Sequence, residues 1–140
     1  MIKLQENKKP LPNLQIVGTG DQETSLRKLA NGLKTVKFLG WQNHKAVQKL
    51  MQQAQAVIVP SREAVNGDCE GLPTVILEAI RAGTVVIATN HAGIPEIISD
   101  KVTGLLSPEG DKDALANSIN YVMLNQNKIV SFIKAAQSRL

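Results

Sequence analysis

The sequence predicts an α/β fold built on an open parallel β-sheet. Two short apolar runs, residues 56–59 and 85–89, are rich in β-branched side chains and are bounded by turn residues, which is typical of buried parallel strands. Between them, the apolar block of residues 75–80 predicts a helix that starts with Pro73 at its first position and ends at Gly83. Strand, helix and strand in this order form the unit from which parallel sheets are made.

The remaining elements are predicted in order along the chain. Residues 1–9 resemble the end of a helix, closed by Pro10 and Pro12. Residues 14–17, 36–39 and 104–106 predict three further short strands. We expect helices over the following ranges: from a cap at Asp21 to about residue 33, from Asn43 or His44 to about residue 54, residues 95–99, residues 111–124 with Asp111 as cap, and residues 127–140.

Two acidic residues flank the start of the central predicted helix. Glu70 precedes Pro73, and Glu78 lies within the helix, about two turns after Glu70. In open α/β sheets, ligands bind beyond the carboxyl ends of the strands, and the N–H groups at a helix start favour phosphate. A carboxylate further along this helix can accept hydrogen bonds from a pair of sugar hydroxyls. The spacing therefore indicates a site for a phosphorylated sugar compound.

Composition restricts the classes of protein to which the chain can belong. The chain has 140 residues, a formal charge of +4 and a single cysteine. Basic residues are scattered and aromatic residues are few, which argues against a platform for single-stranded nucleic acid. No apolar tract reaches the length of a membrane span, and the start lacks the apolar core of a secretory signal. Cys69 has no partner for an internal disulfide, so we expect a reducing, cytoplasmic location.

A glycine turn follows the first predicted strand. Residues 18–20 are Gly-Thr-Gly, but the dinucleotide-binding fingerprint needs a third glycine where this chain has Glu23. We therefore reject NAD binding by that motif. The turn is open to two interpretations, a simple turn after a strand or a backbone segment close to a bound nucleotide. Gly93, in the loop before Pro95, is expected to take up a backbone angle that other residues avoid.

Several motifs together resemble the retaining glycosyltransferases of family four. The main one is the pair of glutamates, Glu70 and Glu78, with Gly-Leu-Pro directly after the first. The others, in the order the family has them, are residues 14–20, 36–41, 59–61 (Val-Pro-Ser), 93–96 (Gly-Ile-Pro-Glu) and 104–106 (Gly-Leu-Leu). The resemblance covers roughly residues 10 to 124. It implies the GT-B architecture of two facing Rossmann-like domains, with helices on both faces of each sheet.

The resemblance implies a donor substrate and roles for matching residues. The donor is a nucleotide-diphosphate sugar, such as a UDP- or GDP-sugar, and transfer retains the anomeric configuration without a metal or cofactor. Glu70 is the expected catalytic residue and contacts hydroxyls of the transferred sugar, while Glu78 holds the ribose hydroxyls. The diphosphate lies at the turn of Gly71, Leu72, Pro73 and Thr74. The resemblance places Gly18, Leu39 and Trp41 near the nucleotide. A second interpretation of Trp41 is that it only covers the end of the strand.

The chain departs from the family at its ends. The part of the sequence that resembles the family starts after the family's first strand and its Arg- and Lys-bearing loop, and we expect no acceptor domain in these residues. We therefore expect residues 1–140 to be a partial donor-binding domain that transfers no sugar alone. The acceptor, a sugar, lipid-linked or glycan molecule, would bind the missing domain. Because that strand is normally central, we also expect exposed strand edges and self-association. The full-length protein is expected to be cytoplasmic or peripheral to the membrane.

Other functions were weighed against this one. A sugar-nucleotide 2-epimerase has the same two-domain architecture, but its catalytic residues are expected in a different order. A non-catalytic receiver module needs an acid where this chain has Gly18 and Gly40. A metal site near Glu63 and Asp68 is less favoured than a solvated loop. His44 and His91 are interpreted as loop or helix-start residues and Cys69 as a bystander.

Overall fold

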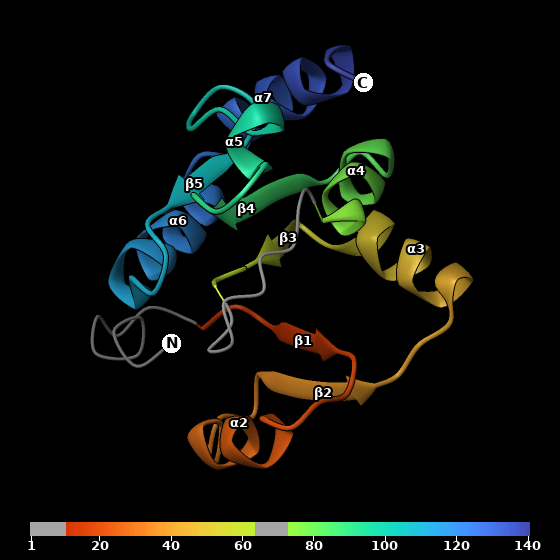
Figure 1. The fold of residues 1–140 in the computed structure, drawn as a ribbon, viewed down its shortest axis with the longest axis vertical. Helices are drawn as coiled ribbons and strands as arrows, with labels where there is room; N and C mark the ends of the chain where they lie inside the picture. Colours follow the sequence, from red (N-terminus) through yellow and green to blue (C-terminus); the bar gives the residue numbers. More distant parts are fainter. Residues whose placement is uncertain (1–10, 64–72) are drawn as a thin grey trace. The chain divides into compact units, whose positions relative to one another are not determined.

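The computed structural model describes residues 11–63 and 73–140 and divides the chain into two compact units (Figure 1). Unit 1 is Met1–Val47 and unit 2 is Gln48–Leu140. The two units are described separately below. Both consist of parallel strands connected by helices, so the predicted α/β class is confirmed.

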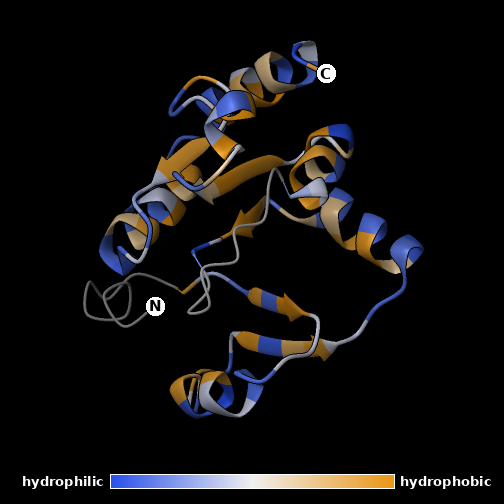
Figure 2. Cartoon of the chain, viewed as in Figure 1, coloured by the Kyte–Doolittle hydropathy of each residue, from blue (hydrophilic) through white to orange (hydrophobic). Residues whose placement is uncertain are grey.

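Unit 1 contains a two-stranded parallel sheet and one helix. Strand β1 (Leu14–Val17) pairs with β2 (Val36–Gly40), and α2 (Glu23–Leu29) connects them. Figure 2 shows each strand as mainly hydrophobic with one hydrophilic band, which is the alternation of a sheet with one covered face. Among the described residues of this unit none is fully buried, and α2 contributes no buried side chain.

Helix α2 differs from its prediction at both ends. It starts at Glu23 rather than near Asp21, with Gln22 as a cap whose side chain makes no capping hydrogen bond. It ends at Leu29 rather than near residue 33, because the backbone then turns through Gly32 at a φ of +83°. Glycine takes this left-handed conformation at little cost, so it ends the helix early.

Helix α3 (His44–Gln53) crosses the boundary between the units. Its start was predicted, and Asn43 is the cap: its side-chain oxygen accepts a hydrogen bond from the Ala46 N–H at 2.8 Å. Its end belongs to unit 2, where Met51 is buried and its carbonyl accepts a 2.6 Å hydrogen bond from the Thr84 hydroxyl. The sequence therefore places a continuous helix at the junction of the two units.

Unit 2 is organised around a three-stranded parallel sheet. Strands β3 (Ala56–Val59), β4 (Val85–Thr89) and β5 (Leu105–Ser107) pair in that order, and β4 lies in the middle. All five residues of β4 are buried. Because neighbouring side chains of a strand point to opposite faces, both faces of this sheet are covered, as predicted for an apolar run of this kind.

Helices cover this sheet and complete the core of unit 2. They are α4 (Thr74–Arg81), α5 (Ile94–Ile97), α6 (Lys112–Leu124) and α7 (Gln126–Ser138). Helices α6 and α7 pack on one face, where the fully buried members of one apolar cluster are Val85, Ile87, Leu105, Val122, Ile129 and Phe132. Asp111 caps α6 as predicted, because its carboxylate accepts a hydrogen bond from the Ala114 N–H at 2.9 Å.

Two local predictions in unit 2 are wrong. Pro73 is the cap of α4, with an extended ψ of 127°, and not its first helical residue. Gly93 has an ordinary helical conformation, and it is Ala92 that adopts a positive φ of 47°. The unusual backbone angle of this loop thus lies one residue earlier, which a rule that assigns such angles to glycine misses.

The end of α4 at Gly83 was predicted and is confirmed. Gly83 has a φ of +78° and donates its N–H to the Ile80 carbonyl. The next residue, Thr84, donates to the Ala79 carbonyl, so the pair forms a Schellman motif that leads into β4.

The described strands form two sheets, where the sequence predicted one. Within the described ranges, β1 pairs with β2 alone and β3 pairs with β4 alone, so no strand is shared by the two sheets. That a single sheet lacking the family's first strand underlies the fold stays a prediction.

Candidate functional site

The predicted nucleotide-contacting residues of unit 1 lie at the carboxyl ends of its two strands. Gly18 follows β1 with a φ of +113°, and its N–H donates to the Gly40 carbonyl at 2.8 Å. Leu39, near the end of β2, is half-buried and its carbonyl accepts a hydrogen bond from the Gln42 side chain. Trp41 is 74% exposed, which does not fit the alternative in which it covers the strand end.

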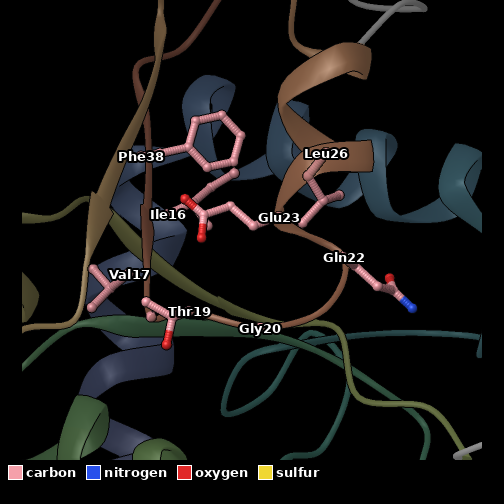
Figure 3. Close-up of a pocket in the computed structure, with 9 residues that line it drawn as sticks. Ile16, Val17, Thr19, Gly20, Gln22, Glu23, Leu26 and Phe38 are labelled. Carbon is pink, nitrogen blue, oxygen red and sulfur yellow. The ribbon is translucent and has the colours of Figure 1, made fainter.

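A hollow opens beside the glycine turn of unit 1 (Figure 3). Its lining includes Gly18, Thr19 and Gly20 together with apolar side chains of both strands. Figure 3 shows Glu23 reaching from the start of α2 toward Ile16 and Phe38. The Glu23 carboxylate pairs with Arg27 at 2.9 Å, and the Arg27 guanidinium lies over the Phe38 ring. The hollow therefore combines an apolar wall with backbone at the turn.

The predicted site residues of unit 2 lie on α4. Pro73 caps the helix without a side-chain hydrogen bond, Thr74 is its exposed first residue, and Glu78 is half-buried. Residues four apart share a helix face, so Thr74 and Glu78 line the same side of α4. The start of α4 follows the carboxyl end of β3 in the chain, where ligands of open α/β sheets bind.

Three predicted site residues, Glu70, Gly71 and Leu72, lie outside the described residues, as do Asp68 and Cys69. Of the described ones, the structure brings Gly18, Leu39 and Trp41 to one sheet edge in unit 1. It places Pro73, Thr74 and Glu78 on one helix in unit 2.

A polar cluster at the carboxyl edge of the β3-β4-β5 sheet was not predicted. His91, interpreted from sequence as a loop residue, does lie in the loop after β4, but it is only 7% exposed and pairs through Nδ1 with Oε1 of Glu109. The same oxygen accepts a hydrogen bond from the Glu63 backbone N–H at 3.1 Å. The pairing joins residues far apart in sequence, so no local spacing indicates it. The only signal was that each residue closely follows a strand.

The described part of the chain contains no group of three or more His, Cys, Asp or Glu side chains arranged to hold a metal ion. None of its helices combines the length and the apolar character needed to cross a membrane.

The fold and the placement of these residues define an α/β domain of the Rossmann-like class with its candidate site at strand ends. The family model for glycosyl transferases group 1 matches residues 1–139. The chain therefore belongs to the group 1 glycosyltransferases, and its structural neighbours are GT-B enzymes.

Curated relatives are named as sugar transferases. The amylovoran biosynthesis glycosyltransferase AmsK of Erwinia amylovora is 34% identical over 128 residues, which are 89% of this chain and 31% of that protein. A GDP-mannose-dependent monoacylated alpha-(1-6)-phosphatidylinositol monomannoside mannosyltransferase of Corynebacterium glutamicum is 37% identical over 110 residues, 77% of this chain and 29% of that protein. The chain thus spans about a third of the length of these relatives.

A similar solved structure is that of Anabaena Alr3699/HepE in complex with UDP-glucose. It has a TM-score of 0.82 at 27% identity and covers 99% of this chain and 38% of that one. The same protein was also solved in complex with UDP.

Proposed function

We propose that this chain is the donor-binding part of a glycosyltransferase that transfers a hexose from a nucleotide-diphosphate sugar, with retention, in polysaccharide or glycolipid synthesis. The observation that carries the proposal is the family match over residues 1–139. Relatives named for amylovoran synthesis and for a GDP-mannose-dependent mannosyl transfer support the pathway class and the donor class. These names favour sugar transfer over a 2-epimerase or a non-catalytic binding module.

In the proposed donor site, different structural elements bind different parts of the donor molecule. The start of α4 binds the diphosphate, because helix-start N–H groups and the helix dipole stabilise the negative charge that develops as the sugar leaves. Glu78, on the same helix face as Thr74, holds the ribose hydroxyls. The family resemblance assigns backbone near Gly18, Leu39 and Trp41 of unit 1 to the nucleotide, and Glu70 to the transferred sugar.

The nucleotide base and the acceptor are expected to be recognised by different parts of the enzyme. Complexes of Alr3699/HepE with UDP and UDP-glucose support a uridine donor, whereas the mannosyltransferase names support a guanosine donor. The acceptor would be bound by a further domain of the kind that makes up the rest of the relatives' length. These 140 residues alone are therefore expected to bind a donor nucleotide without transferring sugar.

The test is a titration of the chain with UDP, GDP and ADP, followed by the shifts of backbone amide resonances. We expect one nucleotide to bind preferentially, with shifts concentrated at the start of α4. The Glu78→Ala variant should weaken binding at least ~10-fold, the loss expected when a charge-assisted hydrogen bond is removed. Glu96→Ala, an exposed glutamate in the first turn of α5, is the matched control and should leave binding unchanged. Equal binding by both variants would contradict the role of Glu78.

A further inference from the structure

One carboxylate oxygen joins three segments at the carboxyl edge of the β3-β4-β5 sheet. Glu63 follows β3, His91 follows β4 and Glu109 follows β5. Oε1 of Glu109 pairs with Nδ1 of His91 and also accepts the Glu63 N–H at 3.1 Å. Because both contacts use the same oxygen, removing this carboxylate releases the segment after β3 and the buried imidazole together.

Two more hydrogen bonds fix the same edge. The Thr89 hydroxyl donates to the Ser61 carbonyl at 2.5 Å, and the Asn90 N–H donates to the Ser107 carbonyl at 2.8 Å. The segment after β3 is thus held at residue 61 by a β4 side chain and at residue 63 by Glu109. Both contacts lie at the carboxyl end of β3, and α4, which carries Thr74 and Glu78, is the next described helix after that strand.

We propose that Glu109 is a positioning residue for the donor site, acting through the Glu63 backbone while His91 holds its carboxylate in place. The inference rests on the proposed function, because the site it serves is the nucleotide site at this sheet edge. A backbone N–H that donates to a carboxylate makes a stronger hydrogen bond than one that donates to a neutral acceptor. The buried His91 ring limits the orientations open to that carboxylate, since it packs where water is largely excluded.

The experiment measures UDP and GDP binding to the 140-residue chain by isothermal titration, alongside hydrogen exchange at the Glu63 amide and thermal unfolding. Glu109→Ala removes both contacts and should weaken binding of the preferred nucleotide ~10-fold, with faster exchange at Glu63. Glu109→Gln keeps an acceptor oxygen for that N–H and should restore binding to within ~3-fold of the unsubstituted chain.

Asp100→Ala is the matched control. The Asp100 carboxylate also accepts a backbone N–H, that of Leu106 at 2.9 Å, and this bond is made to β5 and not to the segment after β3. We expect this variant to lower the unfolding temperature without changing nucleotide affinity. Such a result separates positioning of the site from a general loss of stability.

Three outcomes would overturn the proposal. The first is that Glu109→Ala binds the nucleotide as tightly as the unsubstituted chain, and the second is that Asp100→Ala loses affinity in step with Glu109→Ala. In either case Glu109 has no positioning role, while the proposed function stands. The third is that the unsubstituted chain binds none of UDP, GDP and ADP, in which case the proposed function fails and the inference fails with it.

Discussion

The backbone at Gly104 leaves no room for a side chain. A Cβ atom built there would lie 2.7 Å from the Val86 carbonyl oxygen and 3.1 Å from Cγ2 of Ile98. Since the nearer atom belongs to the backbone of the central strand, it cannot rotate away. Gly104 does not have a positive φ, so backbone conformation is not the reason for glycine here. Glycine is needed because two chain segments approach closely at this position.

We therefore expect Gly104→Ala to destabilise the chain by ~1–3 kcal/mol, the usual cost of overpacking a well-filled interior. The measurement is the midpoint and slope of urea unfolding. Gly20→Ala is the control, because a Cβ atom there meets nothing within 4 Å and the backbone φ is not positive. Equal stability of Gly104→Ala and the unsubstituted chain would show that β4 can shift to accept the methyl group.

Residue-level predictions from sequence succeeded where the signal is local. The caps Asn43 and Asp111 were found because a cap and the N–H it accepts lie three residues apart. The burial of His91 was missed because its partner, Glu109, is brought near by sheet pairing and not by spacing. The positive φ of Ala92 was assigned to Gly93 for a related reason, since the surrounding loop decides which residue bears it.

At the scale of elements, β4 and α2 represent the two extremes of burial. All five residues of β4 are buried, and it is hydrogen-bonded to a strand on each side. Helix α2 has no buried residue and is seven residues long. Short helices gain most of their stability from packing an apolar face, and α2 leaves Leu29 72% exposed.

Hydrogen exchange should rank these elements in that order. We expect the amides of β4 to exchange only through global unfolding, and those of α2 to exchange by local opening with much less protection. Ile87→Ala, which truncates a buried side chain of the core cluster, should lower the global stability by ~2–5 kcal/mol and accelerate exchange in β4. The amides of α2 should be nearly unaffected. Protection of α2 as strong as that of β4 would contradict the ranking.

Element boundaries were predicted well where apolar pattern and turn chemistry agree. The ranges 14–17, 56–59 and 85–89 were found because β-branched runs end at turn residues. Helix α4 ends at Gly83 as predicted, since the Schellman motif needs a residue with positive φ there. Which strands pair with one another was harder to predict from the sequence. The sequence predicted one sheet, and its local pattern does not tell which edges meet.

For the whole molecule, the two sheets leave strand edges that no described strand pairs. Within the described ranges, β1 and β3 each have a partner on one side only. Such edges carry N–H and C=O groups in a row, and these pair readily with another chain. We therefore expect the chain to self-associate as its concentration rises.

Light scattering coupled to size exclusion would check this. The expected result is a mass that rises above 15.1 kDa with concentration. A mass that stays at the monomer value at the highest attainable concentration would contradict the prediction. Infrared spectra recorded alongside would show whether additional strand pairing accompanies the association.

The contrast in burial between the two units also bears on how the chain is made. Synthesis proceeds from the amino terminus, so residues 11–47 emerge from the ribosome before any residue that is fully buried in the described chain. None of these residues is fully buried even in the folded chain, so little hydrophobic burial stabilises the segment as it emerges. The early segment therefore emerges while β4 and the helices around it are still to be translated. During that interval it is the natural target for chaperones and proteases.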